Sequence, residues 1–396
     1  MQQSKRLPSA APTPLFDRDI VCIGFADWRT ELWTNQHHLM SRLAEHNRVL
    51  FVESLGLRRP QLAGRDLTRI ARRLRSGLAG ARLEDGVWVL SPLVLPLHGS
   101  AVARRVNGQL LPRLVRRGAR RLGPSRPVLW SYVPQAEVLI ETLDPSLIIY
   151  HCVDDIASQP GIDGESFRAS EARFAARADL VLASAPSLER RMRELNDSVL
   201  FAPNVADTAL FATALEEGPV DSALASLPRP RVVFTGAVVA TKLDFALIRE
   251  LARSSAGSSI VLVGPVGLGD PGTDVSELSR EPNIHLLGAR LYAALPEILR
   301  GADAAVIPYA RNTLTDSIFP MKVYEYLAAG LPIVATRLPS LEGLGDVAFA
   351  DTGSEMAELL ARLISADTPT LRRERSGRAA GHSWERRIEE IEAALG

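Results

Sequence analysis

Short apolar runs alternate with helix-length segments along the first half of this 396-residue chain. A helical segment near Gln36–His46 lies between the first two runs, and stretches rich in arginine, leucine and alanine separate most of the later ones. Short apolar strands separated by helices are typical of a parallel sheet covered on both faces. The pattern predicts strands at Asp19–Phe25, Arg48–Glu53, Val87–Leu90, Val128–Tyr132, Leu147–Cys152, Leu180–Ala183 and Val199–Phe201.

The alternation begins again after residue 230. Strands are predicted at Val232–Thr235, Ile260–Val263, Ile284–Leu287, Ala304–Ile307 and Ile333–Ala335, and helices at Leu243–Arg253, Leu291–Leu299, Met321–Ala329 and Trp384–Leu395. The fold class expected is α/β, with two doubly wound, Rossmann-like domains facing across a cleft. In this architecture ligands bind in the crevice at the carboxyl ends of the strands.

Domain boundaries follow from the break in the pattern. Residues 214–230 are acidic, rich in small side chains and bounded by proline. We expect a disordered lead-in over 1–17, an N-terminal domain over 18–207 and a linker over 208–230. A C-terminal domain then covers 231–380, and a helix at 381–396 packs back toward the N-terminal domain. A chain of this length accommodates two such domains.

The net charge of zero hides an asymmetry. The stretch 58–126 holds 16 arginines against three acidic residues, a net charge of +13. Such a stretch favours an anionic membrane surface or a phosphorylated acceptor. The alternative is an arginine-rich solvated surface. Nucleic acid is not expected, because no aromatic series is interleaved with the arginines.

Several other classes are excluded by composition. The two cysteines, Cys22 and Cys152, lie far apart in apolar runs, which argues against a disulfide scaffold and fits a reducing cytoplasm. No apolar stretch reaches the roughly 20 residues of a membrane span, and the N-terminus lacks the apolar core of a signal peptide. The adjacent pair His37-His38 lacks metal-ligand spacing, so no metal and no other cofactor is expected.

The most informative segment is 317–336, SIFPMKVYEYLAAGLPIVAT. Pro320 suits the first turn of a helix, and free amides around Ile318 and Phe319 predict an anion site at its positive end. Lys322 adds a cation, and Glu325 lies about one turn further, where a carboxylate accepts two hydrogen bonds from a ribose diol. Together they predict a receptor for a diphosphate and a ribose.

The competing interpretation of this segment is a capped helix with a Lys322–Glu325 surface pair. Only three of the 46 basic residues are lysine, so a lysine inside such a motif suggests chemistry. A second candidate group ends a strand of the N-terminal domain on the cleft side. There His151 is expected to bind donor or acceptor, and Asp154 or Asp155 to deprotonate an acceptor hydroxyl. The alternative for these carboxylates is a capped turn.

EYLAAGLPIVAT with P-x-K upstream resembles the nucleotide-sugar segment of GT-B-fold glycosyltransferases, the group 1 family with an E-x7-E motif. Glu325 occupies the second Glu position, and Ser317 replaces the first. Other segments also resemble this family, in particular its teichuronic-acid and exopolysaccharide transferases. They are the loop at 26–37, FAPNVAD at 201–207, NIHLLG at 283–288 followed by Tyr292, and HSW at 382–384.

The resemblance implies roles for further residues. Gly236 lets the donor diphosphate approach the backbone, and Lys242 contacts phosphate. Gly288 and Tyr292 lie below the nucleobase, and Ser317 takes a donor contact. The C-terminal domain binds the donor and the N-terminal domain binds the acceptor. The acceptor-binding residues expected in the first loop are Gly24, Asp27, Trp28, Thr34 and Asn35.

The expected function is transfer of a hexose-type sugar from a nucleoside diphosphate sugar to a hydroxyl acceptor, without a metal. The acceptor expected is a glycan or lipid-linked polysaccharide intermediate at the inner face of the cell membrane, where the protein binds peripherally. Two alternatives stay open: a nucleotide-sugar 2-epimerase of the same fold, and a non-catalytic sugar-nucleotide or glycan-binding protein. A dehydrogenase is less well supported, because no strand precedes a good glycine fingerprint.

Overall fold

The computed structural model describes residues 15–30, 32–54, 80–92, 101–159 and 161–396. The predicted disordered lead-in lies largely outside these residues. Leu15 lies inside them, is 2% exposed and packs in the core of the N-terminal unit. Residues 58–79 and 93–100 of the basic stretch are also outside the described part.

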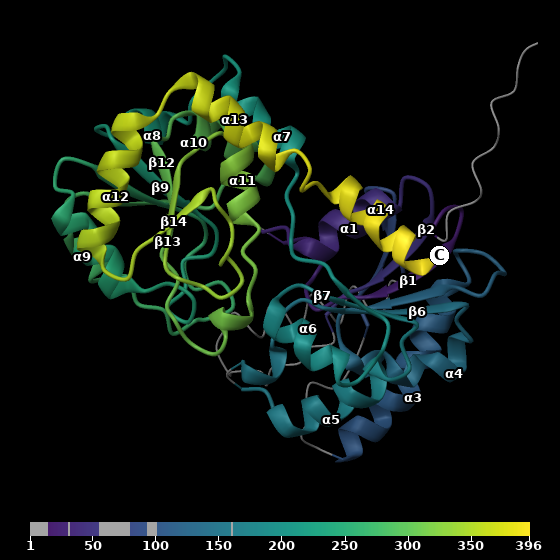
Figure 1. The fold of residues 1–396 in the computed structure, drawn as a ribbon. Coiled ribbons are helices and arrows are strands. Elements are labelled where there is room, and N and C mark those ends of the chain that lie inside the picture. Colours follow the sequence, from purple (N-terminus) through teal and green to yellow (C-terminus); the bar gives the residue numbers. More distant parts are fainter. Residues whose placement is uncertain (1–14, 31, 55–79, 93–100, 160) are drawn as a thin grey trace, which may run out of the picture.

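The chain forms two sheets, each the centre of one lobe (Figure 1). The N-terminal unit contains the eight-stranded sheet, with strand order β3-β4-β2-β1-β5-β6-β7-β8, parallel except for the β3–β4 hairpin. Its strands are β1 Asp19–Ile23, β2 Arg48–Val52, β3 Arg82–Glu84, β4 Val87–Leu90, β5 Val128–Ser131, β6 Leu147–Cys152, β7 Leu180–Ala183 and β8 Val199–Phe201.

The C-terminal unit contains six parallel strands in the order β11-β10-β9-β12-β13-β14. They are β9 Arg231–Thr235, β10 Ser259–Val263, β11 Ile284–Gly288, β12 Ala304–Ile307, β13 Ile333–Ala335 and β14 Val347–Phe349. The predicted α/β fold class is confirmed, and every strand predicted from an apolar run lies in one of the sheets.

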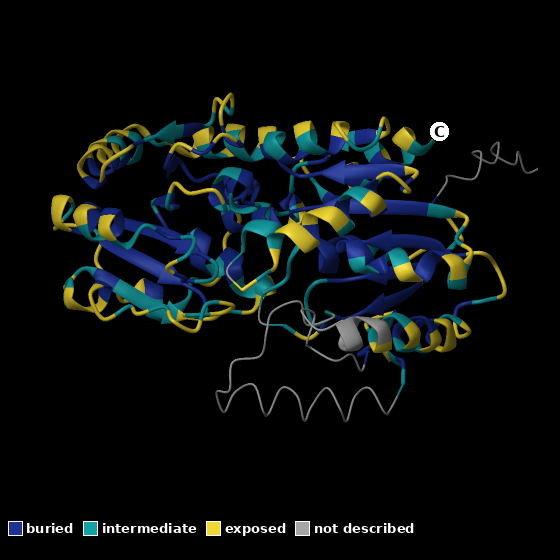
Figure 2. Ribbon diagram, turned by 90° about the horizontal axis from the view of Figure 1, so that it is seen from below, coloured by how far each residue is buried: buried dark blue, intermediate teal, exposed yellow. Residues whose placement is uncertain are grey.

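Helices cover both sheets. Those of the N-terminal unit are α1 Asn35–Leu43, α3 Ala101–Ala119, α4 Ile140–Leu143, α5 Gly164–Ala175 and α6 Pro186–Arg193. Those further along are α7 Thr208–Ala212, α8 Ser222–Ala225, α9 Phe245–Ser254, α10 Leu295–Arg300, α11 Lys322–Ala328, α12 Gly353–Ala366, α13 Pro369–Ala379 and α14 Trp384–Leu395. Most strands are dark blue in Figure 2, whereas the covering helices present yellow, exposed residues to solvent.

The segment between the sheets is structured. Helices α7 and α8 lie within the predicted linker, and Phe211 and Leu224 belong to the core of the C-terminal unit. At the far end of the chain, α14 lies on the N-terminal unit: Trp384 and Ile391 are fully buried there, and Glu385 pairs with Arg42 of α1. The boundaries given above for the two domains stay a prediction.

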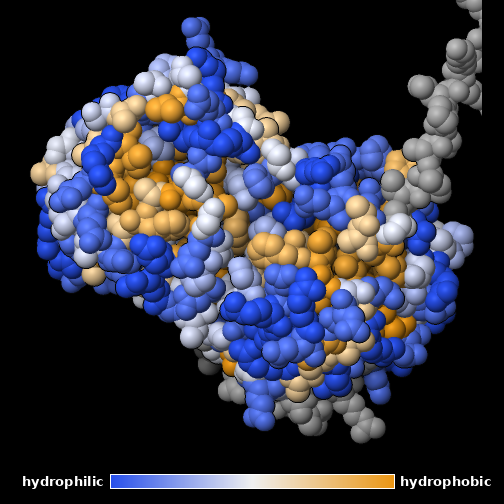
Figure 3. Space-filling model, in the orientation of Figure 1, coloured by the Kyte–Doolittle hydropathy of each residue, from blue (hydrophilic) through white to orange (hydrophobic). Residues whose placement is uncertain are grey.

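The two lobes meet at a narrower waist, with apolar side chains visible on this face of both (Figure 3). Direct hydrogen bonds cross the junction, for example from the Asn204 side chain to the Phe319 carbonyl oxygen. No described helix has the length and apolar character to cross a membrane.

Candidate functional site

The strand order places one switch point in each sheet. In the C-terminal unit the chain adds β10 and β11 on one side of β9, and β12 to β14 on the other. Doubly wound sheets bind ligands at the carboxyl ends of the strands that flank such a point. Gly236 follows β9 directly, and Tyr309 follows β12. The site therefore forms around these two positions.

The Lys322 side chain lies against Gly236. A Cβ atom placed on Gly236 would be 2.4 Å from Lys322 Cε and 2.7 Å from Nζ, so a side chain here would displace the cation from this position. Gly236 also has a φ of +132°, which other residues rarely adopt. The ammonium is 5.6 Å from the Phe234 ring centroid. Burial lowers the pKa of Lys322, and the Glu325 charge opposes that change.

Glu325 lies in α11, one turn after Lys322, and is 4% exposed. Burial raises the pKa of its carboxyl, and the Lys322 charge and the Tyr292 hydroxyl act in the opposite direction. The two side chains are not an exposed surface pair, as the competing interpretation required. Tyr292 in turn packs on His38 of α1, with ring centroids 4.7 Å apart. Helix α11 and the segments packed against it thus bring together four of the predicted donor residues: Gly236, Lys322, Glu325 and Tyr292.

The segment before α11 differs from the expectation. The Ile318 amide donates to the Thr315 carbonyl, because residues 315–317 form a tight 3-10 turn, so it is not free to bind an anion. Its carbonyl accepts from Ser340 Oγ at 2.6 Å. Pro320 precedes the helix instead of occupying its first turn, since α11 begins at Lys322. The predicted free amide at Ile318 is therefore wrong.

Ser317 and Phe319 bond to the N-terminal unit. Ser317 is 6% exposed, and its Oγ lies 3.1 Å from Ser187 Oγ at the start of α6. The Phe319 carbonyl accepts from Asn204 Nδ2 at 2.8 Å. In this conformation both residues join the two units, and the donor contacts predicted for them stay a prediction.

A chain of three hydrogen bonds crosses the junction. Tyr132 Oη donates to Asn35 Oδ1 at 2.9 Å, Asn35 Nδ2 donates to Asn204 Oδ1 at 2.8 Å, and Asn204 donates to Phe319 as described. The side-chain amides of Asn35 and Asn204 thus each donate one of these hydrogen bonds and accept another. Asn35 is 5% exposed and its amide is engaged, which leaves no free surface for the predicted acceptor contact.

Asp154 faces the C-terminal unit across the junction. Burial raises the pKa of its carboxyl, and the nearby Lys242 charge lowers it. Tyr309 feels both side chains. Burial raises the pKa of its hydroxyl, the Lys242 charge lowers it, and the Asp154 charge raises it. The structure thus brings Asp154 and Lys242, predicted separately, to one place at the C-terminal switch point.

Asp155 has a different role. It is 6% exposed and accepts from Arg168 Nη2 at 3.1 Å and from Arg191 Nη1 at 3.3 Å. Arg191 also pairs with buried Glu171 at 3.2 Å. Two guanidinium groups hold the Asp155 carboxylate, so it anchors the turn after β6. Of the two predicted bases, only Asp154 faces the other unit.

His151 does not face the cleft as expected. It is 1% exposed and its ring stacks on Tyr132, with centroids 4.9 Å apart. Burial lowers the pKa of His151 to about 3, so the imidazole is neutral at neutral pH. The reason is that both faces of this parallel sheet are covered, so every side chain of β6 enters a core. The predicted contact with donor or acceptor is not supported.

The predicted acceptor loop is mostly engaged in packing. A Cβ on Gly24 would meet Phe51 at 2.4 Å, so this glycine serves close packing. Trp28 is 2% exposed, and Thr34 caps α1 through a reciprocal bond with His37. Asp27 is partly exposed. In the C-terminal unit, Gly288 ends β11 in an exposed position with a φ of +69°.

The sequence analysis did not predict that Tyr309 and Asn204 contribute to the site. Tyr309 could have been found from the switch-point rule, because it follows β12 closely. The bridging role of Asn204 has no local signal, since its partners Asn35 and Phe319 lie 169 and 115 positions away. Among the described residues, no group of three or more histidine, cysteine or acidic side chains is placed to hold a metal ion.

Comparison with known proteins agrees with this geometry. Residues 229–366 match the family model described as Glycosyl transferases group 1. A Bacillus subtilis protein named as a teichuronic acid biosynthesis glycosyltransferase, TuaH, is 29% identical over 231 residues. That alignment covers 54% of this chain and 56% of the relative, so it spans about half the length of each.

Solved structures resemble nearly the whole chain. Anabaena HepE in complex with UDP and glucose superposes with a TM-score of 0.67 at 16% identity, covering 96% of this chain and 99% of HepE. Sucrose-phosphate synthase from Thermosynechococcus elongatus gives 0.63 at 15% identity, covering 94% and 97%. These similarities show a common fold. Residues 229–366 thus match the model of the family Glycosyl transferases group 1, in a chain that has the GT-B fold.

Proposed function

We propose that this protein is a glycosyltransferase that moves a hexose-type sugar from a nucleoside diphosphate donor to a hydroxyl acceptor. The observation that carries the proposal is the position of Lys322, packed on Gly236 at the switch point and one turn from buried Glu325. A cation beside an open backbone suits a diphosphate, and a carboxylate suits a ribose diol. The HepE complexes with UDP and with UDP-glucose support a uridine diphosphate sugar as the donor.

The chemistry follows from charge. As the bond to the sugar breaks, the diphosphate gains negative charge, which the Lys322 ammonium stabilises without a metal. Asp154, on the opposite side of the junction, accepts the proton of the acceptor hydroxyl if the reaction inverts configuration. Lys242, near Asp154, favours the ionised carboxylate. The C-terminal unit holds the donor and the N-terminal unit holds the acceptor.

The function is tested by incubating the protein with UDP-glucose and other nucleotide sugars and following products by NMR. A transferase releases the nucleoside diphosphate together with a glycoside or, through water, a free sugar, and EDTA leaves the rate unchanged. An epimerase instead forms the 2-epimeric sugar. Binding of a donor without turnover would indicate a non-catalytic protein and contradict the proposal.

Replacing Glu325 with glutamine is expected to weaken donor binding. A neutral amide accepts from a diol less strongly than a carboxylate, and a charge-assisted hydrogen bond contributes about 1.5–3 kcal/mol, or roughly 10- to 150-fold in affinity. Calorimetric titration with UDP measures the change. Equal affinity for both proteins, with unchanged thermal unfolding, would remove Glu325 from the site.

We also propose that the protein binds peripherally to the cytoplasmic face of the membrane and acts on a lipid-linked or cell-surface polysaccharide intermediate. The support comes from α3 and the turn after it. Arg113, Arg116, Arg117 and Arg120 are all exposed, and none pairs with a carboxylate within the described residues. Their spacing places them along one side of the helix. Many other arginines, by contrast, form ion pairs, such as Arg193 with Glu189 at 2.7 Å.

Replacing these four arginines with glutamine is expected to abolish co-sedimentation with anionic liposomes at low salt. Each contributes about 1 kcal/mol near such a surface, so together they supply about 4 kcal/mol. The wild-type protein should be released at high salt, since the Debye length falls from about 10 Å at 0.1 M to about 3 Å at 1 M.

The matched control for the liposome experiment removes four exposed arginines that form ion pairs elsewhere, at positions 173, 193, 311 and 386. It should bind like the wild type. If neutral vesicles bind as well as anionic ones, or if both quadruple variants lose binding equally, the α3 arginines are not a membrane surface.

A further inference from the structure

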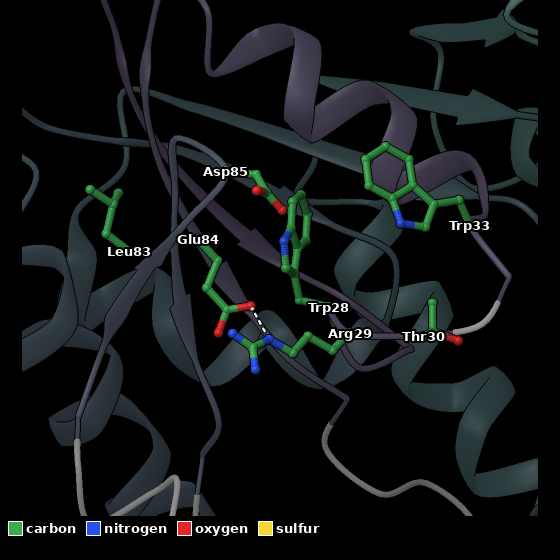
Figure 4. Close-up of a pocket in the computed structure, with 7 residues that line it drawn as sticks. All are labelled: Trp28, Arg29, Thr30, Trp33, Leu83, Glu84 and Asp85. Atoms are coloured by element: carbon green, nitrogen blue, oxygen red, sulfur yellow. Dashed lines mark hydrogen bonds and ion pairs between the residues drawn. The ribbon is translucent and has the colours of Figure 1, made fainter. Parts of the chain in front are cut away.

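A pocket of about 370 Å³ lies in the N-terminal unit, at the β3 edge of its sheet. Two segments line it: the loop between β1 and α1, with Trp28, Arg29 and Trp33, and the β3–β4 hairpin, with Leu83, Glu84 and Asp85 (Figure 4). Its volume is within the range of about 300–1,000 Å³ that is usual for small-molecule sites.

The pocket is built on fixed groups. Trp28 is 2% exposed, its amide donates to Glu53 Oε1 at 2.9 Å, and its ring packs 5.0 Å from that of Phe51. Arg29 Nε donates to Glu84 Oε2 at 2.8 Å and ties the loop to the hairpin (Figure 4). The Glu84 side chain is 8% exposed, whereas that of Arg29 is 80% exposed. One carboxylate is therefore held in place while the guanidinium beside it is open to a ligand.

The lining charges indicate the kind of ligand. The lining contains one guanidinium and two carboxylates, Glu84 and Asp85, and Glu84 also pairs with Arg82, so it offers no excess of positive charge to a phosphate or another anion. The same groups are complementary to hydroxyls, because carboxylates accept and a guanidinium donates hydrogen bonds. The partly exposed Trp33 ring supplies apolar area with an electron-rich face, which suits the C–H side of a sugar ring. Buried Trp28 supports it, with ring centroids 6.2 Å apart.

The location separates this pocket from the proposed reaction centre. Trp28 packs over β2, and Asp154 follows β6, three strands further along the sheet. At about 4.8 Å per strand, the two are about 14 Å apart across the sheet. A sugar ring in the pocket is therefore not the ring that reacts.

We propose that this pocket binds one neutral sugar ring of an extended acceptor glycan, at a distance from the hydroxyl that is glycosylated. The inference rests on the proposed transferase function. It assigns an acceptor role to the β3–β4 hairpin and to Arg29 and Trp33, and it gives the acceptor a length of more than one sugar unit.

Saturation-transfer NMR tests the pocket without any donor. The probes are methyl glycosides of neutral hexoses and N-acetylhexosamines, with methyl glucuronide and inorganic phosphate as anionic probes. Neutral glycosides should bind the wild type. Arg29→Ala should weaken that binding about 10-fold or more, the effect of losing a charged hydrogen-bond partner. Trp33→Ala should act in the same direction.

The control is Arg126→Ala, which breaks an exposed ion pair of the same unit, Arg126 with Asp144 at 2.8 Å, and should bind glycosides like the wild type. Absence of binding by all neutral glycosides, stronger binding of phosphate, or equal binding by the Arg29 and Arg126 variants would overturn the proposal. Calorimetry with UDP separates the two claims. If UDP binds and glycosides do not, the pocket assignment fails alone; if UDP does not bind any variant or the wild type, the transferase proposal fails.

Discussion

Replacing Lys322 with alanine is expected to lower kcat by about 10²–10³-fold, the usual cost of removing one group that stabilises developing negative charge. Binding of the intact nucleotide-sugar donor should weaken much less, because the leaving diphosphate carries more charge in the transition state than in the bound donor. The contact with Gly236 places the ammonium where such a charge would form. Steady-state kinetics and calorimetry on the same preparation measure the two effects.

Two further variants separate charge from packing at this position. Lys322→Met keeps the length of the side chain without its charge, and it should be as inactive as the alanine variant. Lys322→Arg should recover only part of the rate, because a planar guanidinium does not fit the space beside Gly236 as a compact ammonium does. Full activity in the methionine variant would show that the cation has no role in the reaction.

Asp154→Asn is expected to lower transfer by about 10²–10⁴-fold, the contribution usual for a general base, while UDP binding stays close to that of the wild type. Burial raises the pKa of Asp154. Because the base must be ionised, activity should fall as pH decreases through that raised pKa, at a higher pH than an exposed aspartate with a pKa of about 3.9 would give. The pH profile of kcat/KM measures this limb.

Asp197→Asn is the matched control for the base, because Asp197 is an exposed aspartate of the same unit. It should leave both the rate and the pH profile unchanged. Product NMR is needed beside the kinetics. If the product keeps the donor's anomeric configuration, an inverting base is not required, and the role given to Asp154 would be withdrawn even if its variant were inactive.

The strands could be predicted from the sequence because buried parallel strands are continuous apolar runs. Those at Leu147–Cys152, Leu180–Ala183 and Ala304–Ile307 match β6, β7 and β12 residue for residue. The same signal missed β3, whose sequence Arg-Leu-Glu lies at a sheet edge with only partial burial. It also missed β14, which lies at an edge of the other sheet and has only its first residue fully buried. Short or edge strands take their structure from their neighbours more than from their own composition.

The site could be predicted only in part, for a related reason. A charged helix start could be predicted because Pro320, Lys322 and Glu325 are close in sequence and their spacing indicates it. The bonds that engage Ile318 and Asn35 depend on where distant segments lie, and no local pattern encodes them. His151 was misplaced because a strand that is buried on both faces has no polar side that would indicate which way its side chains point.

A crystal structure of the protein with UDP tests the central claim most directly, because the claim concerns where a nucleotide binds. The account predicts the diphosphate beside Gly236 and within hydrogen-bonding distance of Lys322 Nζ, with both ribose hydroxyls on the Glu325 carboxylate. A nucleotide bound elsewhere, or a diphosphate held away from Lys322 with the ribose turned from Glu325, would contradict it.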